Sequence, residues 1–217
     1  MTFAAELIAD RGKAASGEEF FRSPAFLEAE EVTHSLRIAG DDDELLAPLI
    51  VRPIDGTDRS DAISPYGYPG FDAAGDVHID LSDVDFAPTG LVSIFIRHTL
   101  GESPLSGASE RNIVQIADPA LPPKSRMSDR QQIRRNLRDG YELRLVPGPE
   151  ATSAERTGFL VAYEETMRRA GAAERYFFAA AYFERALRSS RSWLALAHAP
   201  GGEIAAASLA VRSDGFI

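Results

Sequence analysis

The sequence contains no cysteine, which excludes disulfides, thiolate nucleophiles and cysteine-ligated zinc. It has no apolar run close to the roughly 20 residues that a membrane-spanning helix needs. The start, MTFAAELIADRGK, lacks the basic residues and apolar segment of a secretory signal. We therefore expect a soluble, cytoplasmic protein without a membrane span.

Several catalytic motifs are also missing. The chain has neither a Gly-x-Gly-x-x-Gly phosphate loop nor the Gly-x-Ser-x-Gly of a hydrolase. Its four histidines are scattered, without the spacing of metal ligands: His34, His78, His98 and His198. We expect no metal site and no tightly bound cofactor, and the sequence does not identify a catalytic residue.

The net charge of −10 conceals an asymmetry between the two halves. Residues 1–120 carry 8 basic and 22 acidic side chains, whereas residues 121–217 carry 15 and 11. Arginine supplies 21 of the 23 basic residues, which suits carboxylate or phosphate partners and equally suits a GC-rich bacterial genome. The acidic first half would repel RNA, so any nucleic-acid contact is confined to the second half.

The hydrophobic pattern predicts a strand-rich first half. We expect strands at Val32–Ala39, Leu45–Ile54, Leu91–Arg97 and Arg111–Ala117, the third of them buried on both faces. Gly40–Asp43 is a plausible hairpin loop between the first two. Three prolines within Asp118–Arg126 predict an extended connector.

The second half changes to a helical period. Expected elements are a helix from a Ser128/Gln131 capping box to Asp139, a strand at Tyr141–Val146, a helix behind a Thr152/Glu155 capping box, an aromatic helix over Tyr176–Leu187, and strands at Trp193–His198 and Ile204–Val211. The turn at Pro200–Gly202 should pair the last two strands as an antiparallel hairpin.

Three stretches, in this order, carry a family resemblance over residues 62 to 212. They are the segment SPYGYPG (64–70), the strand VSIFIR (92–97), and a helical series that comprises RRNLR (134–138), Gly140-Tyr141, YEETMRR (163–169), Tyr176-Phe177 and Tyr182-Phe183. They resemble the "PYGYGG" segment, the "vSvFvR" strand and the basic, "Y-x-x-T-x-x-R" and aromatic helices of the FemABX-like aminoacyltransferases, a branch of the GNAT acyltransferases.

The resemblance implies an α+β fold of two GNAT-like mixed-sheet modules side by side, at residues 1–120 and 121–217. The second module resembles an incomplete one, because it stops after its third strand, before the loop that holds the donor pyrophosphate. The implied activity is transfer of an acyl or aminoacyl group from acyl-CoA or aminoacyl-tRNA to an amine, on a small or peptidoglycan-precursor-like acceptor. The alternatives are an acyl-CoA-dependent N-acetyltransferase and a non-catalytic binding fragment.

The resemblance also selects an acceptor site. It points to Tyr66 and Tyr68, two phenols in a rigid turn, and to Arg169 as the contact to an anionic acceptor. The alternatives are a tyrosine-lined bend and a solvated arginine. Tyr176 is a further acceptor-site candidate and an alternative core residue. We expect Tyr66, Tyr68 and Arg169 to converge on one cleft.

The carboxylates Asp61 and Asp72 flank this turn and are placed to orient an acceptor amine.

Arg130, Arg134 and Arg138 lie four residues apart and form one stripe of the predicted helix. Such a stripe can follow the phosphates of a tRNA, and it can equally be a solvated face.

The apolar strand Ile204–Val211 is expected to keep one open edge. An open edge recruits a strand from another copy or aggregates, so we predict association of the chain.

Overall fold

The chain is α+β, as the sequence predicts. The computed structural model describes residues 3–15, 19–41, 43–73, 75, 77–101, 103–109, 113–118, 120–122 and 125–217. Its contacts divide it into two compact units. Unit 1 consists of residues 1–108, 178–192 and 210–217, and unit 2 consists of residues 109–177 and 193–209.

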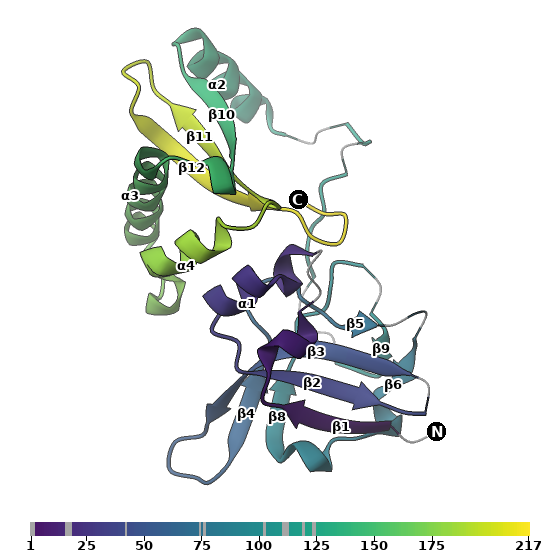
Figure 1. Ribbon diagram of the computed structural model, residues 1–217. Helices are drawn as coiled ribbons and strands as arrows, with labels where there is room; N and C mark the ends of the chain where they lie inside the picture. The colour runs from purple at the N-terminus through teal and green to yellow at the C-terminus, as the bar shows by residue number, and fades with distance from the viewer. Residues whose placement is uncertain are drawn as a thin grey trace. The chain divides into compact units, whose positions relative to one another are not determined.

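A curled, mixed sheet forms most of unit 1, in the strand order β7-β1-β2-β3-β4-β8 (Figure 1). The strands are β1 (Phe3–Ile8), β2 (His34–Ala39), β3 (Glu44–Pro53), β4 (Ser60–Ile63), β7 (Val84–Asp85) and β8 (Leu91–Phe95), and β5 (Asp72–Ala73) also pairs with β3. Strands β1 to β4 are antiparallel, whereas β7 and β8 are parallel to β1 and β4. Because β3 pairs with β2 along its first part and with β4 along its last four residues, the sheet curls into half a barrel.

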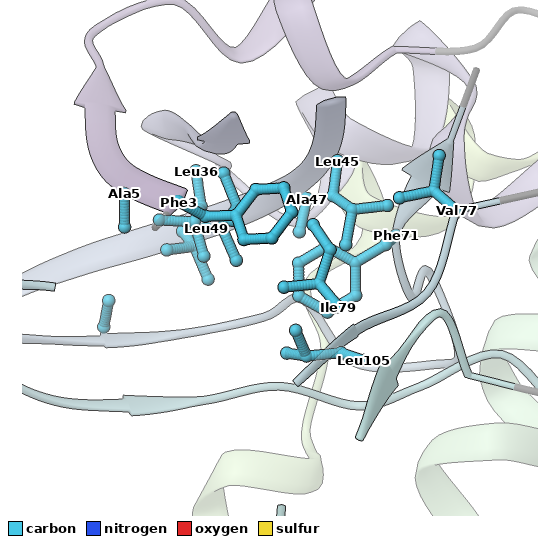
Figure 2. Close-up of a cluster of buried hydrophobic side chains, with 12 residues drawn as sticks. Phe3, Ala5, Leu36, Leu45, Ala47, Leu49, Phe71, Val77, Ile79 and Leu105 are labelled. Carbon is cyan, nitrogen blue, oxygen red and sulfur yellow. The ribbon is translucent and has the colours of Figure 1, made fainter. Parts of the chain in front are cut away.

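The core of unit 1 lies against one face of this sheet (Figure 2). Alternate residues of a strand point to the same face, so β1, β2 and β3 each contribute a row of buried side chains. The parallel pair β6 (Ile79–Asp80) and β9 (Leu105–Ser106) adds two buried side chains to this core, those of Ile79 and Leu105. The labelled core residues are Phe3, Ala5, Leu36, Leu45, Ala47, Leu49, Phe71, Val77, Ile79 and Leu105.

Two helices that are far apart in sequence pack together in unit 1. Helix α1 (Pro24–Ala29) buries Phe26 and Leu27, and α4 (Ala180–Ala186) buries Phe183. Arg185 of α4 forms an ion pair with Glu28 of α1 at 3.4 Å. Unit 1 is therefore completed by a segment of the second half of the chain.

Residues 213–216 form a tight turn in unit 1. Ser213 and Phe216 exchange both backbone hydrogen bonds, at 3.0 and 2.9 Å. The buried Arg22 donates to the carboxylate of Asp214 at 2.7 Å, and the backbone N–H of Asp214 donates to Glu19 at 2.6 Å. These charge-assisted bonds fix the turn to the one-turn 3-10 helix Phe20–Arg22.

Unit 2 is built on the three-stranded sheet β10-β11-β12, formed by Glu142–Pro147, Ser192–His198 and Ile204–Val211. The loop 199–203 joins β11 to β12, so the predicted hairpin is confirmed. Helix α3 (Ser153–Arg169) packs beside the sheet (Figure 1). It begins at Thr152 with the predicted capping box, in which Thr152 and Glu155 each bond the other's backbone N–H.

Strand β12 lies at one end of the strand order of this sheet in the described part of the chain. Association of copies through its edge stays a prediction.

The other predicted capping box, at Ser128 and Gln131, is wrong. Helix α2 (Met127–Arg138) begins two residues earlier than a Ser128 N-cap implies, and its N-cap is Arg126, whose side chain makes no capping bond. Ser128 lies within the first turn of the helix, where its hydroxyl hydrogen-bonds the neighbouring Asp129. The predicted end of the helix is correct, since Gly140 takes the left-handed conformation with φ +88°.

Three other predicted elements also differ. The described residues 113–118 are not a strand, and Ile113 is 96% exposed. Strand β8 exposes Val92 and Ser93, so it is not buried on both faces. The aromatic helix over 176–187 is divided into the 3-10 turn Glu174–Tyr176 and α4. An apolar pattern forms a strand only where a neighbouring strand is available to pair with it.

Candidate functional site

The turn at residues 64–70 is attached to the end of β8. The backbone N–H of Ser64 donates to the carbonyl of Phe95 at 2.9 Å, and that of Gly70 donates to the carbonyl of Arg97 at 3.0 Å. The hydroxyl of Ser64 accepts from the backbone of Arg97 at 2.9 Å. The turn is thus closed at both ends against one strand terminus.

Two glycines of the turn are required by its geometry. Gly67 has φ +118° and Gly70 has φ +54°, both in the region that favours glycine. A Cβ atom on Gly67 would meet the Phe21 ring at 2.5 Å, and one on Gly70 would meet the backbone nitrogen of Thr99 at 2.7 Å. The backbone of the turn therefore approaches its neighbours more closely than any other residue type allows.

Arg22 holds the same turn from inside unit 1. Its Nη1 donates to the carbonyl of Pro69 at 2.7 Å, while its Nη2 binds Asp214. This buried guanidinium connects the turn at 64–70 to the turn at 213–216 and limits the motion of both.

The two tyrosines of the turn have different neighbours. The ring of Tyr68 is half-buried and meets Phe21 edge to face, with centroids 6.0 Å apart. Tyr66 is 52% exposed, and its ring faces Phe178 at 5.9 Å. Tyr68 therefore packs into the aromatic cluster of Phe20, Phe21 and Phe26, whereas Tyr66 is available to a ligand.

Glu30 lies beside Tyr66, at the end of α1. The helix ends there because Glu31 has φ +55° and the backbone N–H of Val32 reaches back to the carbonyl of Leu27, which is a Schellman motif. This ending directs the Glu30 carboxylate to the turn, where Oε2 accepts from the backbone N–H of Tyr66 at 2.7 Å. Its Oε1 is enclosed and has no hydrogen-bond partner among the described residues.

Burial raises the pKa of Glu30 above its usual value of 4.5. Hydrogen bonds from the Tyr66 backbone and the Tyr182 side chain, together with the positive charge of Arg97, oppose this effect and are the smaller contributions. Glu30 is therefore a carboxyl group that accepts a proton more readily than an exposed glutamate.

Arg97 completes the cluster from the end of β8. Its Nη1 donates to the carbonyls of Ser64 and Pro65 at 2.7 and 3.4 Å. Its guanidinium also lies over the rings of Tyr66 and Phe95, 5.7 and 5.1 Å from their centroids. A cation over an aromatic face is attracted by the ring quadrupole.

Aromatic residues around α4 form the remaining side. Phe178 stacks on Tyr182 with centroids 4.5 Å apart, and Phe178 also faces Tyr66. We call Glu30, Tyr66, Arg97, Phe178 and Tyr182 the Glu30 cluster. All five belong to unit 1, and they come from four separate stretches of the chain.

Of the five residues of the Glu30 cluster, the sequence predicts only Tyr66 as a site residue. The signal for Glu30 was an N-terminal helix signature, Ser23-Pro24, whose serine caps α1 by accepting from the backbone of Phe26. The Ser23-Pro24 signature predicts helix α1, but it does not predict which residues the side chain of Glu30, at the C-cap, contacts.

Other predicted site residues have structural partners or lie elsewhere. Asp61 forms a two-pronged ion pair with Arg52, at 2.9 and 2.8 Å, and Asp72 lies in β5. Arg169, the last residue of α3, is exposed in unit 2. Tyr176 is half-buried in unit 2, where its carbonyl accepts from the hydroxyl of Tyr163. The predicted convergence of Arg169 with Tyr66 joins residues of different units and stays a prediction.

The arginine stripe lies on helix α2, whose residues are almost all exposed. No residue of α2 is buried, and Arg130, Arg134 and Arg138 are all exposed. Arg134 and Arg138 line a shallow hollow of about 880 Å³ together with Gln131 and Gln132. Arg135 forms an ion pair with Asp139 at 3.6 Å, whereas none of the three stripe arginines forms an ion pair within the described residues.

The described residues contain no group of three or more histidine and acidic side chains that could hold a metal ion. No described helix combines the length and apolarity that crossing a membrane requires.

Comparison of the chain with protein-family models, with curated proteins and with solved structures finds no match.

Proposed function

We propose that the protein transfers an acyl or aminoacyl group to an amine, with Glu30 as the group that receives the amine and its proton. The observation that carries the proposal is the enclosed Oε1 of Glu30, which has no hydrogen-bond partner among the described residues. A buried polar atom without a partner costs free energy, and an ammonium ligand would remove that cost.

The chemistry requires few groups. The ammonium of the acceptor gives one proton to the Glu30 carboxylate, and the freed lone pair attacks the carbonyl carbon of the donor. A C–N bond forms, and the C–O bond of an ester or the C–S bond of a thioester breaks. The second proton of the nitrogen goes to the leaving oxygen or sulfur. Because the raised pKa of Glu30 lies closer to neutrality than that of an exposed glutamate, it is a better proton acceptor.

The element order of the second half of the chain, in which α4 belongs to unit 1, supports the same family of reactions. Strand β10 is followed by α3, α4 and then β11 and β12, and the three strands are neighbours in chain order. A strand, two helices and two antiparallel strands are how the GNAT fold begins, and this order accompanies the motif resemblance to FemABX-like enzymes. A shared fold does not determine a function, so this support is by analogy.

The donor in this proposal is acyl-CoA or aminoacyl-tRNA, both of which carry phosphates and occur in the cytoplasm. The exposed stripe Arg130, Arg134 and Arg138 supports an anionic donor. If the stripe binds tRNA, a triple glutamine variant should lower the slope of log affinity against log salt by roughly one unit per lost contact. An unchanged slope would show that the stripe is a solvated face and does not contact the phosphates of tRNA.

The direct test is transfer of a radiolabelled acyl group from acetyl-CoA, and from charged tRNA, to a mixture of amines. We expect amide product with one donor, and a loss of about a hundredfold or more in Glu30→Gln, which cannot accept the proton. Glu31→Gln is the matched control, because it removes the adjacent exposed carboxylate. Equal activity of both variants would contradict the role of Glu30. No product with either donor would favour the non-catalytic binding module.

A further inference from the structure

The carboxylate of Glu30 and the guanidinium of Arg97 both hydrogen-bond the peptide group between Pro65 and Tyr66. The N–H of Tyr66 donates to Glu30 Oε2 at 2.7 Å, and the carbonyl of Pro65 accepts from Arg97 Nη1 at 3.4 Å. This N–H and this carbonyl belong to one planar, trans peptide. The bonded atoms of the carboxylate and the guanidinium are therefore at most about 8 Å apart.

Both charged groups keep unused hydrogen-bonding capacity. Glu30 Oε1 has no partner, and Arg97 uses only Nη1 of its guanidinium for the bonds to Ser64 and Pro65. A guanidinium has five N–H donors, so those on Nε and Nη2 remain for a ligand. Within the described residues, neither nitrogen has a hydrogen-bond partner.

We infer that Glu30 and Arg97 together form a binding site for the zwitterion of a free α-amino acid, which is the acceptor amine of the proposed function on which this inference rests. In an α-amino acid the ammonium nitrogen and the carboxylate oxygens lie about 3 Å apart, and a hydrogen bond of about 2.8 Å at each end spans about 8 to 9 Å. The upper limit of about 8 Å between Oε2 and Nη1 places the carboxylate and the guanidinium close enough for one ligand of this size to reach both groups. The ammonium binds Glu30 Oε1, and the carboxylate binds the free edge of Arg97.

The aromatic residues define the side chain that the site accepts. The backbone N–H of Tyr66 and the side chain of Tyr182 hydrogen-bond the Glu30 carboxyl, and the ring of Phe178 contacts the rings of both tyrosines. Rings beside a carboxylate attract an ammonium through their faces and an apolar side chain through burial. The expected ligand therefore has an aromatic or branched apolar side chain. Tyr66, 52% exposed, is the ring of the cluster that a ligand meets from the solvent.

The inference is tested by calorimetric binding to the full chain without any donor. The probes are L-phenylalanine, 2-phenylethylamine, which lacks the carboxylate, and 3-phenylpropanoate, which lacks the ammonium. L-phenylalanine should bind at least about tenfold more tightly than either analogue, because only it forms both charge-assisted interactions. Equal binding of all three, or no binding of L-phenylalanine at millimolar concentration, would overturn the inference.

Variants assign the two ends of the ligand. Glu30→Gln should weaken L-phenylalanine and 2-phenylethylamine about equally, and Arg97→Lys should abolish the preference for L-phenylalanine over 2-phenylethylamine. The controls are Glu31→Gln and Arg52→Lys, which change exposed residues of unit 1 outside the cluster. Because the analogues are compared on the unmodified protein, a variant that fails to fold does not remove the test.

Failure of this inference is distinguishable from failure of the proposed function. Selective binding of L-phenylalanine with no transfer from either donor would sustain the amino-acid site and contradict the transferase. Transfer to 2-phenylethylamine as readily as to L-phenylalanine would sustain the transferase and contradict the zwitterion site.

Discussion

Glu30 is the residue on which the account of the site depends, and its ionisation should affect stability. Burial raises its pKa above 4.5 in the folded protein, so the folded state binds this proton more tightly than the unfolded chain. The resulting stabilisation is complete below about pH 4.5 and is lost as the pH rises through the raised pKa.

Glu30→Gln is neutral at every pH and should not show this loss. We expect the free energy of unfolding of the variant, relative to the unmodified protein, to increase between about pH 4 and pH 7, as measured by urea denaturation. If the difference in the free energy of unfolding between the two proteins stays constant over this range, the folded and unfolded states bind the Glu30 proton equally.

Glu31 is a second residue with a specific expectation. Its φ of +55° is the left-handed region, which costs a residue with a Cβ atom roughly 1 kcal/mol. Glu31→Gly should therefore stabilise unit 1 by up to about 1 kcal/mol, whereas Glu31→Ala, which keeps the Cβ atom, should not. Thermal unfolding of the two variants checks this, and equal transition temperatures would contradict the αL ending of α1.

At the scale of elements, the turn at 64–70 depends on Gly70. Gly70→Ala combines a positive φ with a Cβ atom 2.7 Å from the Thr99 backbone, so we expect a destabilisation of about 2 to 3 kcal/mol. Gly75→Ala is the control, since it also has a positive φ and its Cβ atom would meet nothing within 4 Å. Urea denaturation should show that Gly70→Ala lowers the free energy of unfolding more than Gly75→Ala does, because only the first places a Cβ atom against the Thr99 backbone. Equal decreases in the two variants would contradict this close contact.

The elements that sequence predicted well are those fixed by local chemistry. The capping box at Thr152 and Glu155, the hairpin around Gly40 and the glycine ending of α2 are satisfied by residues within a few positions of each other. In contrast, the expected strand at 111–117 needed a partner strand, which no local pattern supplies. The Glu30 cluster was missed for the same reason, because its residues are brought together only by tertiary packing.

At the scale of the whole molecule, unit 1 needs the segment 178–192 from the second half. A chain of residues 1–120 lacks α4, the helix that packs against α1. We expect this chain to show no cooperative thermal transition, because the buried face of α1 would meet water.

The matched control joins residues 178–192 and 210–217, the remaining parts of unit 1, to the same chain through flexible linkers, which should restore a cooperative transition. Cooperative unfolding of the 1–120 chain at the temperature of the full chain would show that α4 is dispensable.

The role of Glu30 is tested by a ¹³C NMR titration of its carboxyl carbon in the full chain, with and without L-phenylalanine. We expect the pKa of Glu30 to lie above 4.5 in the free protein and to fall when the ligand binds, because an ammonium favours the ionised carboxylate. A pKa at or below 4.5 that the amino acid does not move would contradict this role.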